Sequence, residues 1–326
     1  MSAATEVLVV GAGIAGLRAA RTLADTGAKV LVLEKSRGFG GRAATKRVHE
    51  NRVDHGAQYF TARDPRFQAQ VKVWEESGDL KVWSRGFHTL GRSGLQGPDE
   101  GHPRYIFQGG MNTIGKLLGE GLNVRRSAKV IRISRVAAGW QVNLEDGGAV
   151  TAERLVLNLP APQALELGAH VFSAQTCEQL RQVEFTPCLA LMAGYKEAAP
   201  EWSGITVEDD NNPLSWLASS TSKRPQKDPA VLVLHANPSF SKMHLENPEA
   251  AVPEMLRVAA SLGFSDPLWT QLQRWRYAKA ATPYGEPYLK DSGSLFLCGD
   301  WCGGAKVEAA YVSGLEVAQA LLERNT

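Results

Sequence analysis

The feature that most constrains this chain is a glycine-rich turn, GAGIAG at residues 11–16, between two short β-branched runs. EVLVV (residues 6–10) leads into the turn, and KVLVLE (residues 29–34) follows it after leucines and alanines at helical spacing. This pattern predicts a strand, a tight turn, a helix and a second strand that together form a parallel βαβ unit. We therefore expect an α/β protein with a Rossmann-like dinucleotide-binding sheet.

Each glycine of the turn has a role in such a unit. Gly11 permits the tight turn, Gly13 leaves room for a pyrophosphate, and Gly16 lets the helix pack closely on the strand. The helix N-terminus offers free N–H groups and a partial positive charge to phosphates. Glu34 ends the second strand, at the spacing of an acid that accepts hydrogen bonds from the adenosine ribose.

A second Gly-Gly-Arg, at residues 40–42, is more than a nicotinamide-binding unit needs. A buried flavin adenine dinucleotide requires further contacts, and these glycines allow close backbone approach while Arg42 neutralises a phosphate. Near the other end, LFLCGD presents Asp300 to ribityl hydroxyls, and the helix beginning near Val307 faces the flavin pyrimidine edge. The three elements together predict FAD.

These elements stand at both ends of the sequence, so the FAD-binding domain must be discontinuous. A length of 326 residues also exceeds what one compact core usually holds. Between the elements, helical and strand patterns alternate in a region that we assign to an α+β substrate domain. The expected boundaries are 1–75, 104–162 and 274–326 for the FAD-binding domain, and 76–103 and 163–273 for the substrate domain.

Composition excludes several other classes of protein. A net charge of +2 with 21% charged residues argues against nucleic-acid binding. The four cysteines lack metal-ligand spacing, so no metal is expected, and Cys298 and Cys302 are either a redox pair or, as we favour, separate thiols. No apolar run reaches the roughly 18 residues of a spanning helix, and no leader is visible. We expect a cytoplasmic protein without membrane or nucleic-acid partners.

Three further stretches narrow the family: DHGAQYFTARDPRF (54–67), RYIFQGGMNTIGKLL (104–118) and CGDWCGGAKVEAAYVSG (298–314). With the three-part flavin pattern, they resemble the renalase family, bacterial type, within the FAD amine-oxidase superfamily. The resemblance implies a p-hydroxybenzoate-hydroxylase-like fold. It also implies oxidation of dihydro isomers of NAD(P), reduced at the 2 or 6 position of the nicotinamide, to NAD(P)⁺. Oxygen then takes the electrons and becomes hydrogen peroxide.

The resemblance also implies particular site residues. Besides the glycines Gly11, Gly13, Gly16 and Gly41, it places at the flavin Ala15, Glu34, Lys35, Arg42, Gln58, Tyr59, Val130, Asp300 and Val307. The substrate site would be bordered by Tyr59, Phe60, Thr61, Ala62 and Arg63, although the first two are also compatible with plain core aromatics. No cysteine stands in the setting used for covalent attachment, so FAD is expected to be non-covalent.

Other candidates have two interpretations. His235 closes the run AVLVLHA and is either a satisfied core residue or a catalytic or substrate-contacting residue near the flavin, where renalases place a histidine. Trp216 and Trp275 could line the pocket, but we expect them in the core. A cluster that could meet substrate phosphates, but that we expect in a solvated loop, comprises Lys223, Arg224 and Lys227.

Two rival functions remain open from the sequence. An FAD amine oxidase or desaturase is the nearest, although the strand TPCLALMAGYK has no lysine in its first nine residues, where amine oxidases carry one. A non-catalytic flavoprotein redox sensor is the second, and it predicts no open cavity over the flavin. A small-molecule dihydronicotinamide substrate with oxygen as acceptor is the prediction that we carry forward.

Overall fold

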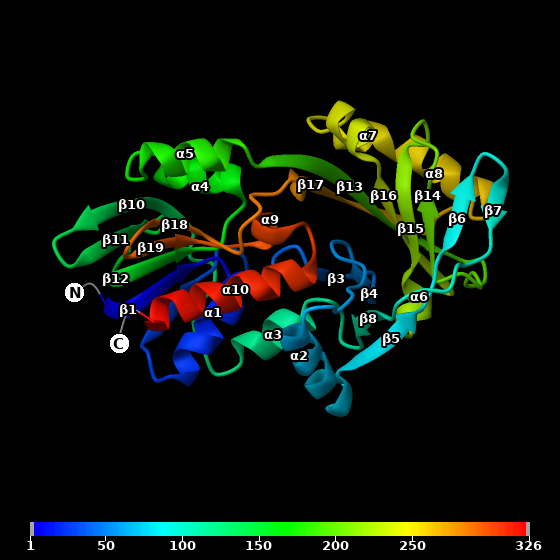
Figure 1. The fold of residues 1–326 in the computed structure, drawn as a ribbon. Helices are drawn as coiled ribbons and strands as arrows, with labels where there is room; N and C mark the ends of the chain where they lie inside the picture. Colours follow the sequence, from blue (N-terminus) through cyan, green and yellow to red (C-terminus); the bar gives the residue numbers. More distant parts are fainter. Residues whose placement is uncertain (1–2, 324–326) are drawn as a thin grey trace.

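The computed structural model describes residues 3–323 and has two lobes, which a pair of long strands connects (Figure 1). These strands are β13 (Glu184–Tyr195) and β17 (Trp269–Thr282), which pair antiparallel along nearly their whole length. Each lobe is built around its own sheet. The chain crosses between the lobes repeatedly, because segments from both ends of the sequence complete the first sheet.

Among the described residues, the first sheet has eight strands: β1 (Ala3–Val10), β2 (Val30–Leu33), β9 (Asn123–Arg125), β10 (Val130–Val136), β11 (Gly139–Leu144), β12 (Ala149–Leu157), β18 (Leu289–Ser292) and β19 (Leu295–Leu297). Their order is β10-β11-β12-β1-β2-β9, and β19 pairs with both β12 and β18. The centre is parallel, because β1 runs parallel to β2 and β12, and β12 runs parallel to β19. The predicted βαβ unit is therefore at the centre of the sheet.

Helices cover both faces of this sheet, which is why the C-terminal ends of its central strands, residues 7–10 and 155–157, are continuously apolar. One face packs against α1 (Ile14–Asp25), α3 (Thr113–Gly119) and α10 (Val307–Leu322). The opposite core includes residues of α4 (Ala161–Gly168) and α5 (Ala174–Arg181). The last two helices thus belong to the first lobe, although most of their residues lie within the 163–273 segment that the sequence assigns to the substrate domain.

The second sheet has seven strands in the part of the chain that the structure describes; β17 forms one of its edges, and β13 lies next to it. The others are β6 (His88–Gly91), β7 (Gly94–Gln96), β14 (Gly204–Val207), β15 (Leu214–Ser219) and β16 (Ala230–Ala236), in the order β17-β13-β16-β15-β14-β6-β7. Side chains of β16 alternate between two cores: Leu232 and Leu234 pack with α8 (Val252–Ser261), while Val231 and Val233 face the first lobe.

Short elements join the lobes. The hairpin of β3 (Thr45–Val48) and β4 (Asn51–Asp54) packs on the second sheet through Val48 and Val53. The remaining elements are α2 (Pro65–Glu76), β5 (Leu80–Ser84), β8 (Arg104–Phe107), α6 (Ser220–Lys223), α7 (Pro238–Met243), a 3-10 turn at Pro248–Ala251, and α9 (Asp300–Gly303). The fold class is confirmed: a Rossmann-like lobe with an inserted α+β lobe. No helix within residues 3–323 combines the length and apolar character needed to cross a membrane.

Candidate active site

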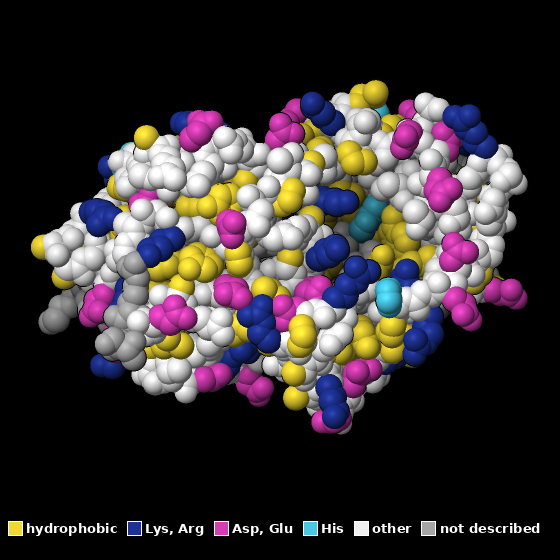
Figure 2. All heavy atoms as spheres, viewed as in Figure 1, with side chains coloured by type: hydrophobic (Ala, Val, Ile, Leu, Met, Phe, Trp, Pro, Cys, Tyr) yellow, Lys and Arg dark blue, Asp and Glu magenta, His cyan; other side chains and the backbone are white. Residues whose placement is uncertain are grey.

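A cavity of about 1450 Å³ lies between the two lobes, and both lobes contribute to its wall. Figure 2 shows this face hollowed between the lobes, with basic side chains and a histidine at the hollow. One end of the cavity is formed by the glycine-rich turn and its neighbours, and the other by β13, β15, β16 and β17. We call these the cofactor end and the substrate end.

At the cofactor end, helix α1 begins immediately after Gly13, and no side chain caps its first turn. Its free N–H groups are therefore available to an anion, since both Gly13 and Ala15 line the cavity. Glu34 is held by two backbone donors: the Ala12 N–H donates to Oε2 at 2.8 Å, and the Ser36 N–H donates to Oε1 at 2.7 Å. The acid is thus fixed at the C-terminal end of β2, beside the turn.

The glycines of the turn are required by protein packing as well as by ligand access. A Cβ at Gly11, whose φ is +104°, would lie 2.4 Å from the Asn158 carbonyl oxygen. A Cβ at Gly13 would lie 2.7 Å from the Asn158 amide nitrogen, and one at Gly16 would lie 2.3 Å from the Gly11 carbonyl oxygen. Sequence reasoning missed Asn158, which directly follows β12 and presses against the turn from the neighbouring strand.

The second Gly-Gly-Arg lies directly beside the first turn. Gly40 forms an isolated parallel bridge with Gly13, and its N–H donates to the Ala12 carbonyl at 2.9 Å. The adjoining Arg42 forms a 2.6 Å ion pair with Asp300, and both line the cavity. Burial raises the pKa of Asp300 against the opposing effect of Arg42. Two residues expected at the flavin are therefore also partners of each other.

The cofactor end fits a long dinucleotide. Two uncapped helix N-termini, at α1 and α10, meet the cavity from one lobe, and Arg42 adds a cationic donor for phosphate. Of the predicted cofactor residues, Gly16 lies behind the wall. Those that line the cavity are Gly11, Gly13, Ala15, Glu34, Lys35, Gly41, Arg42, Gln58, Tyr59, Val130, Asp300 and Val307.

The substrate end has an aromatic wall. Tyr59 packs with Trp216 and Phe87, with ring centroids 5.8 and 5.0 Å away. Trp275 stacks on His55 at 5.3 Å and donates its Nε1–H to the His55 carbonyl at 2.9 Å. Trp216 and Trp275 line the cavity, so the expectation that they belong to the core is wrong. They lie on the cavity face of a sheet that is covered on both sides, and strand periodicity does not distinguish the two faces.

Two histidines stand in this wall with free ring nitrogens. Within residues 3–323, His55 Nδ1, His235 Nε2 and the Trp216 indole nitrogen are buried without a hydrogen-bond partner. Burial lowers the pKa of both His55 and His235 to about 4, so both rings are neutral near pH 7. His235 lines the cavity, as its interpretation as a catalytic or substrate-contacting residue requires. Sequence reasoning missed His55, although it lies in the DHGAQYF stretch.

The remaining predicted substrate residues do not reach the cavity wall. Phe60 is 3% exposed and stacks in the first-lobe core against Tyr105. Thr61 and Ala62 are half-buried outside the lining, and Arg63 is exposed, with its backbone N–H donating to Glu308. Of the YFTAR run, only Tyr59 lines the cavity, so it alone keeps a place in the site that we propose.

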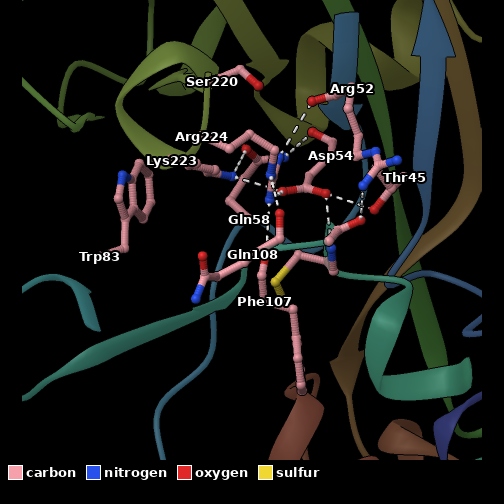
Figure 3. A network of polar contacts seen from close by, with 12 residues as sticks. Thr45, Arg52, Asp54, Gln58, Trp83, Phe107, Gln108, Ser220, Lys223 and Arg224 are labelled. Carbon is pink, nitrogen blue, oxygen red and sulfur yellow. Dashed lines mark hydrogen bonds and ion pairs between the residues drawn. The ribbon is translucent and has the colours of Figure 1, made fainter. Parts of the chain in front are cut away.

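The basic segment after β15 is not a solvated loop. Lys223 and Arg224 are buried against Asp54 of the first lobe, with nitrogen–oxygen distances of 3.5 and 2.8 Å (Figure 3). Lys227 alone of the three is on the surface, where it pairs with Glu50. The expectation of solvation fails for the first two because their partner lies 169 and 170 residues earlier in the chain.

The cysteines are all free, and one of them lines the cavity. That residue is Cys188, and burial raises its pKa to about 12. Burial also raises the pKa of Cys298 to about 12 and that of Cys302 well above its ordinary value, so neither provides the thiolate of a redox pair. Residues 3–323 contain no cluster of histidine, cysteine and acidic side chains that could hold a metal.

Comparison with known proteins agrees with this geometry. Residues 9–74 match the NAD(P)-binding Rossmann-like domain, and residues 75–322 match the flavin containing amine oxidoreductase family. The chain belongs to the flavin containing amine oxidoreductase family, and it is an FAD-dependent oxidoreductase. Within this superfamily it is similar to renalase from Mus musculus, with 27% identity over 97% of this chain and 98% of that protein.

Other relatives share the fold or a shorter segment. A putrescine oxidase from Kocuria rosea is 37% identical over 34% of this chain and 22% of its own length. A solved structure of a putrescine oxidase variant superposes with a TM-score of 0.79 at 14% identity, covering 99% of this chain and all of that one. Cyclohexylamine oxidase from Brevibacterium oxydans gives 0.78 at 13%, covering 98% and 99%. At these identities the structures establish the fold.

Proposed function

We propose that this protein oxidises dihydro isomers of NAD(P), reduced at the 2 or 6 position of the nicotinamide, to NAD(P)⁺. FAD, when bound, supplies the hydride acceptor, and the electrons pass to oxygen. The overall reaction balances as dihydronicotinamide plus oxygen plus one proton giving NAD(P)⁺ and hydrogen peroxide. Similarity to renalase along nearly the whole chain supports this choice over other oxidations in the superfamily.

The observation that carries the proposal is the charge of the substrate end. Among the described lining residues the carboxylates are Glu34, Glu166 and Asp300. Glu34 is bound by backbone donors of the turn, Asp300 is paired with Arg42, and Glu166 interacts with Lys129 near β10. None belongs to β13, β15, β16 or β17. An alkylamine, whose ordinary pKa is near 10, would enter as a cation and meet no carboxylate there.

A dihydronicotinamide suits this wall better. It carries no ammonium proton to remove, and loss of hydride makes its ring aromatic, so the protein must stack and orient the ring rather than supply a base. Tyr59, Trp216 and Trp275 present aromatic surface at the cavity. The free nitrogens of His55 and His235 can donate to or accept from a carboxamide. An open cavity with this lining also disfavours a non-catalytic redox sensor.

Anaerobic stopped-flow mixing of the holoprotein with each reductant tests the proposal. We expect isomeric dihydro-NAD(P) to bleach the flavin rapidly, with a chemical step that changes little between about pH 6 and 7.5, since both histidines have a pKa of about 4 and the buried Lys223 a pKa of about 8. His235→Ala should weaken binding or orientation and leave that pH profile flat. Rapid bleaching by putrescine or cyclohexylamine, at a rate that rises as the amine deprotonates, would instead establish an amine oxidase.

We also propose that FAD is held non-covalently. Cys188 lines the cavity, but its thiol is protonated well beyond neutral pH and provides no thiolate for attachment. Acid precipitation should release all of the flavin into the supernatant, where its absorbance is measured. Yellow colour that remains in the washed precipitate would disprove non-covalent binding.

A further inference from the structure

A fully buried ionic cluster joins the two lobes behind the cavity (Figure 3). Asp54 ends β4 in the first lobe, whereas Lys223 and Arg224 come from α6 and the residue after it in the second. The side chains of Asp54 and Lys223 are 0% exposed, and that of Arg224 is 6% exposed. Burying charges is costly unless they are paired, so this cluster is a feature that needs an explanation.

The cluster has one more cation than it has anions. Asp54 accepts from Lys223, from Arg224, from the Thr45 hydroxyl at 2.7 Å and from the Met111 N–H at 2.9 Å. Burial opposes its ionisation, but the two cations hold its pKa below the ordinary value. Burial lowers the pKa of Lys223 to about 8, so the ammonium persists at neutral pH.

The other groups around Lys223 do not neutralise it. The Trp83 ring of β5 lies 4.6 Å from the Lys223 ammonium and offers its π face. His235 of β16 also feels the charge of Lys223, and with a pKa of about 4 it is neutral. One net positive charge therefore stays buried at this place in the lobe junction.

This charge lies directly behind the cavity wall, because Lys223 contacts Gln58, which lines the cavity. Lys223 Nζ donates to Gln58 Oε1 at 2.7 Å, and the Gln58 amide donates to the carbonyls of Asp54 at 2.6 Å and Gly56 at 3.0 Å. Residues 55–59 all line the cavity. The Ala57 N–H in turn donates to the Arg42 carbonyl at 2.9 Å. Lys223 thus reaches from the second lobe to the segment that touches the cofactor end.

We propose that Lys223 is a positioning residue for the flavin, which braces residues 55–59 through Gln58 and favours flavin reduction with its buried positive charge. Reduction adds electrons to the cofactor, and a nearby buried cation stabilises the negative charge that results. The inference rests on flavin binding and is independent of the substrate. It therefore survives if the dihydronicotinamide proposal fails, and the dihydronicotinamide proposal survives if this inference fails.

The test is the midpoint potential of the bound flavin, measured anaerobically on holoprotein against a reference dye. A unit charge acting over about 10 Å through an effective dielectric of about 20 changes an equilibrium constant roughly tenfold. Lys223→Met should therefore lower the two-electron reduction constant about tenfold, which is about 30 mV. The matched control is Lys227→Met, on the surface four residues later, which should leave the potential unchanged. Equal potentials in the two variants would refute the proposal.

A second variant separates charge from loosening of the loop. Lys223→Arg retains the positive charge and should leave the reduction constant near the wild-type value, in contrast to Lys223→Met. A purely structural role would shift both variants in the same direction, and that result would overturn the proposal.

The wild-type holoprotein gives an independent test that needs no variant to fold. Reduction should raise the pKa of Lys223, so the enzyme takes up an extra proton on reduction at pH values just above 8. The potential should fall more steeply with pH in that range, and Lys223→Met should lack the extra slope. A wild-type profile without it would refute the proposal.

Discussion

The two ends of the cavity are built in different ways. The cofactor end uses backbone N–H groups and charged side chains that already have partners, such as Glu34 with two amides and Arg42 with Asp300. The substrate end combines neutral rings with basic side chains of β17, namely Arg274, Arg276 and Lys279. Among its rings, His55 Nδ1 and His235 Nε2 have no partner within the described chain. Fixed charges can bind a cofactor that always carries negative charge, whereas aromatic rings are better suited to a planar substrate that leaves after each turnover.

The difference also concerns how the chain supplies the residues. Most of the cofactor end comes from two short stretches near the glycine-rich turn, together with the segment at Asp300. The substrate end gathers two residues each from β15 and β16, three from β13 and seven from β17, together with the loop at residues 55–59. Four measurements would break or sharpen this contrast, from the largest expected effect to the smallest.

The largest effect should be acid destabilisation through the neutral histidines. Burial lowers the pKa of His55 from 6.5 to about 4. Between these pH values the unfolded chain binds a proton that the folded protein does not, so the free energy of unfolding falls as pH drops from about 6.5 to 4. His55→Phe keeps an aromatic ring on Trp275. Its free energy of unfolding, measured in urea, should fall by about 3 kcal/mol less than that of the wild type over this pH range. Parallel pH curves for variant and wild type would contradict a neutral, desolvated His55.

Next in size is the loss of the cationic donor at the cofactor end. Arg42→Ala should weaken FAD binding by about ten- to a hundredfold, since a charge-assisted hydrogen bond is worth roughly 1.5–3 kcal/mol. Reconstitution of apoprotein, followed by flavin fluorescence quenching, measures this. Arg66→Ala, which breaks ion pairs on the surface of the same lobe, is the control and should bind FAD normally. Unchanged affinity in Arg42→Ala would remove Arg42 from the cofactor site.

A smaller effect should follow from crowding at the turn. Alanine normally stabilises a helix relative to glycine by about 1 kcal/mol. At Gly16 of α1, however, its Cβ would lie 2.3 Å from the Gly11 carbonyl oxygen, so Gly16→Ala should destabilise by about 1–3 kcal/mol in denaturant unfolding. Gly38→Ala, with nothing within 4 Å of the added Cβ, should be close to neutral. A stabilised Gly16→Ala would show that the turn can relax away from Asn158.

The smallest effect should come from the hydrogen bond between Trp275 and His55, within the substrate end. Trp275→Phe keeps a ring on His55 but loses the donor to its carbonyl, a contribution of about 0.5–1.5 kcal/mol. We expect KM for the reducing substrate to rise several-fold, with kcat little changed. Trp140→Phe loses a comparable bond to Ser294 in the first-lobe core, so it should lower stability without changing KM. The same KM change in both would indicate a general loss of stability.

The sequence predicts what local patterns encode. The βαβ unit, Glu34 and Arg42 follow from spacing within the first stretch of chain, and the structure places these residues at one end of one cavity. Local sequence does not indicate which face of a covered sheet a side chain occupies. For this reason the sequence alone places Trp216 and Trp275 in the core. Likewise, local patterns predict that residues 163–273 contain helices, but not that α5 packs on the first sheet.

Contacts between distant segments were beyond prediction from one sequence. Asn158 reaches Gly11 across 147 positions, and Lys223 reaches Asp54 across 169. A basic residue after a strand is usually solvated, and only the tertiary fold shows that Lys223 has an acidic partner, Asp54, in the other lobe. Of the stretch 54–67 that carries the family resemblance, residues 55–59 line the cavity, whereas Phe60 to Arg63, which the resemblance also places at the substrate, lie outside its lining.

The late position of α10 in the chain has a consequence for biosynthesis. The first sheet needs β19, and the core around α1 needs α10, which packs on it through Val317 and Leu321. Both elements come after the whole second lobe has been synthesised. A nascent chain emerging from the ribosome can therefore complete its second sheet only with β17, and its cofactor-binding lobe later still. The phosphate-binding turn precedes both of these elements, so its strand and helix lack part of their packing until β19 and α10 have emerged, and chaperones should engage this segment until then.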